Sequence, residues 1–133
     1  MRSDLDEFKE YFDCYEDNFD RTHAIMDLGK NQVEFGQQPE SATLVPGCQS
    51  RLYVWGEKDH NLQWQFFTTS DGLFSGGMAQ LAVLAVNGHT SEELDTFSIE
   101  WFSEFDLPEL MTSGRMNGFY NLVKIVNAIA TEK

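Results

Sequence analysis

The stretch Leu52-Tyr53-Val54-Trp55-Gly56, followed after a short polar segment by Leu62-Gln63-Trp64-Gln65-Phe66-Phe67, decides how this chain folds. In both runs large apolar residues recur at every second position, which is typical of a β-strand with one buried face. The polar residues 57–61 between the runs predict a turn. The two runs therefore form an antiparallel hairpin with one apolar face, to which residues 41–45 can add a third strand.

The residues before the hairpin predict two helices. Residues 4–13 place Leu5, Phe8 and Phe12 on one face at helical spacing. Residues 17–28 form a second helix, with Gly29 well placed to end it as a C-cap. We expect this second helix to bury Phe19, Ile25 and Leu28. Residues 30–43 carry scattered polar residues, Gly36 and Pro39, and predict a loop.

The residues after the hairpin predict only helices. Ser70-Asp71 can cap a helix over residues 72–86, which is apolar on most sides and belongs in the core. Two short helices follow, one capped by Thr90 or Ser91 and one over residues 99–105, and the last helix spans residues 114–131. This order predicts an α+β fold in a single domain, residues 1–133: a small antiparallel sheet of about three strands packed against several helices.

Composition narrows the class of protein. Of the 133 residues, 41% are hydrophobic and 14% aromatic, too apolar for a disordered chain, and the net charge of −13 argues against a basic nucleic-acid binder. Two cysteines make neither a disulfide framework nor an all-cysteine zinc site. No apolar stretch reaches the length of a membrane span, and the N-terminus lacks the apolar region of a signal peptide. We therefore expect a soluble, cytoplasmic protein with free thiols.

The negative charge is concentrated in two segments. Residues 1–20 hold eight acidic and two basic residues, and residues 90–114 hold seven acidic residues without Lys or Arg. These segments are either solvated helix faces, or an acidic surface that attracts a basic partner, or a mark of a salt-adapted proteome.

The motif with chemical content is Val45-Pro46-Gly47-Cys48-Gln49-Ser50-Arg51, because a cysteine in a loop before a strand is accessible for reaction. Val-x-Gly-Cys-Gln-Ser before Leu-Tyr-Val-Trp resembles the SufE family of sulfur acceptors for cysteine desulfurases. Three further segments match the family's pattern in order: Ile25-Met26-Asp27-Leu28-Gly29, Ser70-Asp71, and Thr112-Ser113-Gly114-Arg115-Met116-Asn117-Gly118. The chain differs from the family at Thr43, often Asn, at Gly76-Gly77, usually Lys-Gly, and at Gly114, where the late segment lacks its proline.

The resemblance implies a SufE/IscU-like fold and a function. Cys48 would accept sulfane sulfur from a pyridoxal-phosphate-dependent cysteine desulfurase of the SufS or CsdA type and pass it, as a persulfide, to an iron–sulfur scaffold. The chain itself would hold no cofactor and no metal, and would act as a monomer or homodimer. It would be a sulfurtransferase-like carrier working with the desulfurase rather than a stand-alone enzyme.

The nucleophile in such a transfer is a thiolate, so Cys48 needs groups that favour the anion. Arg51 and Arg115, the latter brought to the site by the resemblance, would each lower the pKa of the thiol. Asp71 either caps a helix, contacts the partner or holds the shape of the site. Gln49 either fills or orients the loop, and Ser50 belongs to the matched motif. Cys14 lies between acidic residues, which argues against a reactive thiolate there.

Three other functions remain open. A non-covalent adaptor of a desulfurase would tolerate Cys48→Ser. An iron–sulfur scaffold would need several thiolate ligands. A cysteine hydrolase would need His23, His60 or His89 within hydrogen-bond reach of Cys48.

Overall fold

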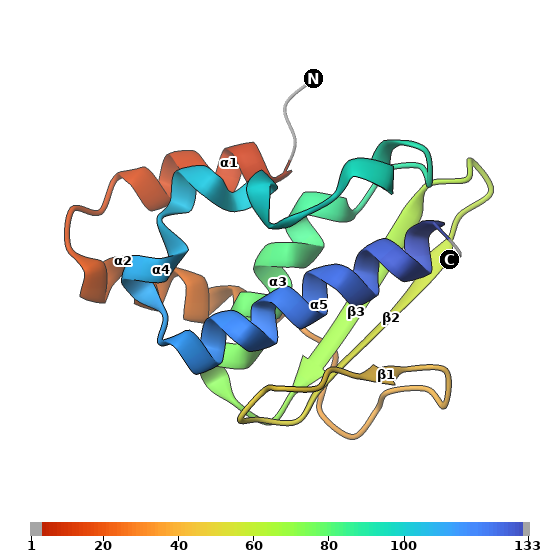
Figure 1. Ribbon diagram of the computed structural model, residues 1–133, viewed down its shortest axis with the longest axis horizontal. Coiled ribbons are helices and arrows are strands. Elements are labelled where there is room, and N and C mark those ends of the chain that lie inside the picture. The colour runs from red at the N-terminus through yellow and green to blue at the C-terminus, as the bar shows by residue number, and fades with distance from the viewer. Residues whose placement is uncertain (1–3, 132–133) are drawn as a thin grey trace.

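The computed structural model describes residues 4–131 (Figure 1). Residues 1–3, on which the expectation about a signal peptide partly rests, and residues 132–133 lie outside this range. The elements, with 3-10 helices written η, are α1 (Asp4–Asp13), α2 (Asn18–Asp27), η1 (Leu28–Asn31), β1 (Thr43–Leu44), β2 (Leu52–Lys58), β3 (Trp64–Ser70), α3 (Leu73–Val86), η2 (Glu93–Thr96), η3 (Ile99–Phe105), α4 (Leu107–Leu110) and α5 (Ser113–Thr131). The α+β prediction is confirmed.

The sheet is the predicted antiparallel one, with strand order β1-β2-β3. Leu52 pairs with Ser70 at one end of the β2–β3 hairpin and Lys58 pairs with Trp64 at the other. The second strand begins at Trp64 rather than at Leu62 as predicted, because Leu62 lies in the turn with a φ of 63°. The Asp59 carboxylate holds this turn by accepting hydrogen bonds from the backbone N–H groups of Asn61 and Gln63.

Helix α3 is buried along almost its whole length, as predicted, and packs along β3, while α5 packs along β2. Helix α2 crosses α3 so closely that a Cβ on Gly77 would lie 2.2 Å from the carbonyl oxygen of Ile25. A Cβ on Gly29 would lie 3.2 Å from the backbone nitrogen of Gly77. The prediction of Gly29 as the C-cap of this helix is wrong: the C-cap of α2 is Leu28, the chain continues into η1, and Gly29 instead permits this close approach.

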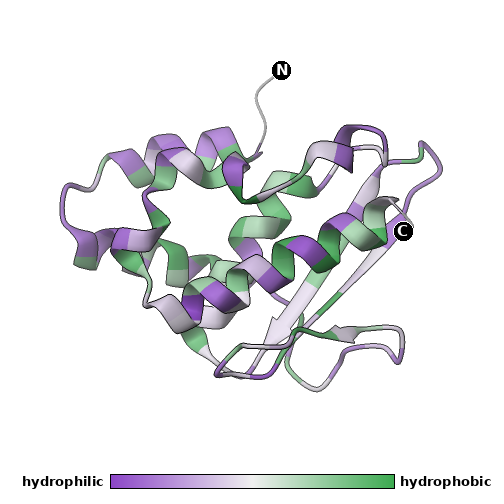
Figure 2. Cartoon of the chain, in the orientation of Figure 1, coloured by the Kyte–Doolittle hydropathy of each residue, from purple (hydrophilic) through white to green (hydrophobic). Residues whose placement is uncertain are grey.

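The two acidic segments meet on one side of the molecule. Helix α1 packs on η3 through Phe8 and Phe12, whose rings lie 6.2 and 5.1 Å from the ring of Phe105. Figure 1 shows α1 running beside the chain that follows α3, and Figure 2 shows hydrophilic residues on its outer side. Each segment therefore presents an apolar face to the other and carries its carboxylates outward, as amphipathic helices do.

One predicted core residue is on the surface. Phe19, expected to be buried by α2, is 69% exposed. It occupies the first turn of the helix, and the buried residues of α2 are Ala24 and Ile25. Helical spacing predicted the helix correctly but placed this side chain on the wrong side of it.

None of the helices among residues 4–131 has both the length and the apolar character of a membrane span.

Candidate functional site

The loop that carries Cys48 connects β1 to β2 and rests on α5. Gly47 has a φ of 81°, and a Cβ there would lie 2.7 Å from the side-chain amide nitrogens of Asn117 and Asn121. The Asn121 amide donates a hydrogen bond of 2.8 Å to the carbonyl oxygen of Pro46. Glycine is thus required for two reasons, the left-handed backbone and the close contact with α5.

The far end of the loop is held by Asp71. Its carboxylate accepts a hydrogen bond of 2.9 Å from the backbone N–H of Arg51, and the Asp71 N–H donates to the Arg51 carbonyl at 3.2 Å. Asp71 therefore does not cap α3, whose N-cap is Gly72 without a side-chain cap bond. Of the three roles considered for Asp71, the hydrogen bond that shapes the site is the one the structure contains.

Cys48 is half-buried, and its sulfur lies against Gly118 of α5. A Cβ on Gly118 would come within 2.6 Å of the Cys48 sulfur, so only glycine leaves room for the sulfur here. The thiol faces a cavity of about 340 Å³ bounded by the loop, by α2, and by the first turns of α3 and α5. The lining residues are Thr22, Met26, Cys48, Gln49, Ser50, Gly72, Leu73, Phe74, Ser75, Met78, Arg115 and Gly118.

The electrostatics of the thiol differ from the prediction. Burial raises the pKa of Cys48, and no positive charge offsets this effect. The Arg115 guanidinium lies 4.5 Å from the centre of the Phe74 ring, a cation–π contact within the cavity wall. Arg51 is exposed and does not line the cavity. The prediction that either arginine lowers the thiol pKa is therefore wrong for this conformation of the loop.

The structure brings together most of the predicted site residues. Cys48, Gln49, Ser50 and Arg115 line one cavity, while Asp71 and the backbone of Arg51 hold its loop. The contributions of α2 and of Asn121 were not predicted from the sequence. Gly118 is the last residue of the matched segment 112–118, but the sequence predicted no role for it. Its contact with the Cys48 sulfur depends on how the loop packs on α5.

The histidines lie elsewhere. The cavity lining within residues 4–131 contains no histidine. The His23 ring makes a tilted contact with the Phe19 ring, and Nδ1 of His89 lies 3.6 Å from a carboxylate oxygen of Glu93. A hydrolase, which needs a base in reach of its cysteine, is not supported by this placement. In the described part of the chain, no three side chains of His, Cys, Asp or Glu come close enough to hold a metal ion.

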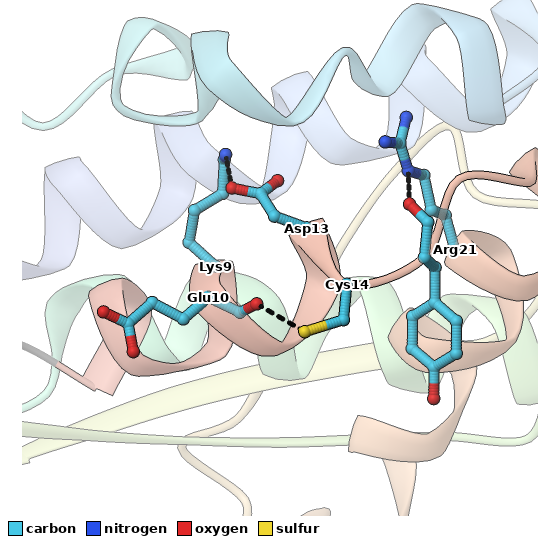
Figure 3. A network of polar contacts seen from close by, with 6 residues as sticks. Lys9, Glu10, Asp13, Cys14 and Arg21 are labelled. Atoms are coloured by element: carbon cyan, nitrogen blue, oxygen red, sulfur yellow. Dashed lines mark hydrogen bonds and ion pairs between the residues drawn. The ribbon is translucent and has the colours of Figure 1, made fainter.

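Cys14 has surroundings of a different kind. It is exposed at the end of α1, and its thiol donates a hydrogen bond of 3.4 Å to the backbone carbonyl of Glu10 (Figure 3). The nearby Lys9–Asp13 ion pair and the hydrogen bond from Arg21 to the Tyr15 carbonyl tie this segment together. Cys14 does not belong to the lining of the Cys48 cavity, and it provides an exposed reference thiol within the same chain.

The chain is similar to several known proteins. It is 28% identical over 102 residues to an uncharacterized SufE-like protein of Haemophilus influenzae, covering 74% of this chain and 80% of the relative. It is 21% identical over 108 residues to the cysteine desulfuration protein SufE of Wigglesworthia glossinidia brevipalpis, covering 80% and 75%. A SufE-like protein of Synechocystis is 26% identical over 123 residues, covering 91% and 76%.

The fold is shared with a solved structure. The solution structure of a hypothetical protein from Thermus thermophilus matches with a TM-score of 0.78 and 15% sequence identity, covering 99% of this chain and 97% of the other. The family model for SufE, described as an Fe–S metabolism associated domain, matches residues 6–130. Because that match spans nearly the whole chain, this protein belongs to the SufE family.

Proposed function

We propose that this protein accepts sulfur from a pyridoxal-phosphate-dependent cysteine desulfurase and carries it as a persulfide on Cys48. The observation that carries the proposal is the placement of the Cys48 sulfur, in a loop held at both ends, against a cavity with room for more than the thiol. The name of the Wigglesworthia relative, a cysteine desulfuration protein, supports the same chemistry. The recipient would be an iron–sulfur scaffold in the cytoplasm, where thiols stay reduced.

The transfer is a thiol–disulfide type of exchange. The Cys48 thiolate attacks the terminal sulfur of a persulfide on the desulfurase, forming a new S–S bond at Cys48. The S–S bond on the desulfurase breaks, and its cysteine leaves as a thiolate that can take up the proton lost from Cys48. Sulfur oxidation state moves with the sulfur, so no outside oxidant or reductant is required.

The resting loop protects the thiol. Burial raises the Cys48 pKa, which keeps the sulfur protonated and poorly nucleophilic at neutral pH. Attack on a partner's persulfide requires the sulfur to leave its contact with Gly118, either by rotation of the side chain or by movement of the loop. Once loaded, a persulfide anion that returns to the cavity lies near the N-terminal turns of α3 and α5, whose dipoles favour negative charge.

The test is intact mass spectrometry after the chain is mixed with a cysteine desulfurase and free cysteine. We expect a mass gain of one sulfur atom that dithiothreitol reverses. The gain should be lost in Cys48→Ser and retained in Cys14→Ser, which removes the exposed reference thiol. An adduct that survives in Cys48→Ser, or no adduct with any desulfurase whose turnover the chain stimulates, would contradict a persulfide carrier.

One observation favours a second function, a non-covalent adaptor of the desulfurase. Burial raises the pKa of Cys48, and Arg115 in the same cavity contacts the Phe74 ring, so the thiol is not activated in the resting state. An adaptor would stimulate desulfurase turnover equally well with Ser at position 48. Turnover of the desulfurase measured with the wild type and with Cys48→Ser separates the two functions.

A further inference from the structure

The exposed Phe19 belongs to a stripe along α2 that folding of the chain does not use. Phe19, Thr22, His23 and Met26 follow one another at helical spacing and therefore share one face of the helix. The Phe19 ring lies 4.4 Å from the ring of His23, centre to centre. At the other end of the stripe, Thr22 and Met26 form part of the wall of the Cys48 cavity.

The stripe continues onto α3 through Leu73. This first residue of α3 is 78% exposed, although the helix behind it is core. Leu73 and Met26 line both the Cys48 cavity and a second hollow of about 380 Å³ next to it. His23 lines that second hollow as well. Met26 and Leu73 thus connect the Cys48 cavity to the second hollow, and His23 connects that hollow to the exposed ring of Phe19.

The second hollow also holds a pair of opposite charges. In the second hollow, Lys30 lies 3.8 Å from Asp27, so the two side chains offset each other. Aromatic residues and methionine are enriched at the centre of protein interfaces relative to the rest of the surface. Single exposed apolar residues need no explanation, but a connected set at the edge of a reactive cavity does.

We infer that the Phe19–Leu73 stripe, made of Phe19, His23, Met26 and Leu73, is where the desulfurase docks the segment that flanks its persulfide cysteine. The inference rests on the proposed function. Direct transfer requires the terminal sulfur of the donor to touch the Cys48 sulfur, so the residues next to the donor cysteine must cross the mouth of the cavity. Leu73 stands at that mouth, and the stripe is the apolar surface continuous with it.

The occupant follows from the same geometry. It is a short exposed loop of the desulfurase with an apolar side chain close to its reactive cysteine, which reaches the second hollow while the cysteine enters the first. Phe19 and Leu73 would be the residues of this chain with the largest loss of exposed apolar surface on docking, and aromatic and pocket-edge residues of this kind dominate the energy of interfaces.

The experiment compares enzymatic and chemical loading of Cys48 in Phe19→Ala and Leu73→Ala. Both side chains are exposed, so both variants should fold. With the desulfurase, we measure the concentration of this chain at which desulfurase turnover is half-maximal. We expect this concentration to rise about ten-fold in each variant, and more in the double variant. With inorganic polysulfide as the sulfur donor, which needs no docking, we expect Cys48 to load at the wild-type rate in Phe19→Ala, whose side chain does not line the Cys48 cavity.

The matched control is Leu62→Ala. Leu62 is also exposed, at 66%, but lies in the hairpin turn at the opposite end of β2 from the Cys48 loop. It should leave the half-maximal concentration unchanged. If both stripe variants keep the wild-type half-maximal concentration and the enzyme still loads Cys48, the docking surface is overturned and the carrier function stays intact. Failure of wild-type Cys48 to load from either donor would instead overturn the carrier function itself.

Discussion

Adding one methyl group at Gly118 tests whether α5 controls access to Cys48. In Gly118→Ala the new Cβ would lie 2.6 Å from the Cys48 sulfur, and 3.5 Å from the Cys48 Cα and the Gly47 carbonyl oxygen. The two longer distances are ordinary contacts. The sulfur alone must move, and it can do so by rotating about the Cα–Cβ bond or by leaving with the loop. Either response takes the thiol out of its buried position.

The steric cost of the new methyl group falls on the state in which the Cys48 loop rests on α5, here called the docked loop. Overpacking of this kind costs about 1–3 kcal/mol, which raises the population with an exposed sulfur by about 5- to 150-fold. Because the sulfur can rotate, we expect the lower part of this range. The better helix propensity of alanine stabilises α5 by up to about 1 kcal/mol. That gain offsets about the lower end of the cost, so the melting temperature should stay close to the wild-type value while the thiol becomes more reactive.

The assay is alkylation of Cys48 by iodoacetamide as a function of pH, in a Cys14→Ser background. Burial raises the Cys48 pKa, so exposure should lower it toward the ordinary value of an unburied thiol and move the midpoint of the pH–rate curve down. The control is Gly114→Ala on the same helix, where a new Cβ meets only the Gln49 amide at 3.8 Å. An unchanged rate and midpoint in Gly118→Ala would refute the idea that this glycine shelters the thiol.

Three further changes test other parts of the structure. Gly77→Ala would place a Cβ 2.2 Å from the backbone oxygen of Ile25, which cannot rotate away, so we expect a loss of about 3 kcal/mol and a melting temperature lower by about 10 °C; an unshifted melting curve would contradict the close crossing of α2 and α3. Asp71→Ala removes the acceptor for the Arg51 N–H at a cost of about 1 kcal/mol and should speed alkylation of Cys48 several-fold. Asp71→Asn keeps an acceptor and should not change the rate. Equal rates in the two variants would count against the idea that this hydrogen bond holds the Cys48 loop. If the acidic surface formed by α1 and η3 attracts the desulfurase, the concentration for half-maximal turnover should rise with ionic strength, and turnover independent of salt would show that these carboxylates are only solvated.

The sequence predicted those parts of the fold whose cause is local. Alternating apolar residues identified β2 and β3, and helical spacing identified all the longer helices, because both patterns depend only on near neighbours. The errors occur where a distant segment decides. Gly29 looked like a helix cap and proved to be a contact with α3. Asp71 looked like a cap for α3 and proved to bind the backbone of Arg51, twenty residues away in the chain.

The candidate site divides in the same way. The motif around Cys48 identified the nucleophile together with Gln49 and Ser50, and the late matched segment identified Arg115; all of them share one cavity. The charge state of the thiol was not predictable, because it depends on the distance and desolvation that docking of the loop creates. Arg115 reaches the cavity but stacks on Phe74, a contact that residue type and spacing alone do not reveal.

Phe19 connects these observations to function. Its spacing predicted burial, and the spacing is real, but the stripe it continues belongs to the mouth of the Cys48 cavity rather than to the core. A thiol whose pKa is raised by burial needs an event that uncovers it, because Arg115, the cation in the lining of its cavity, contacts the Phe74 ring. If a partner covers the stripe beside the cavity, the free energy of burying Phe19 and Leu73 becomes available to displace the Cys48 loop from Gly118. Docking and thiol activation would then be a single event, and the sulfur would become reactive only where a donor is present.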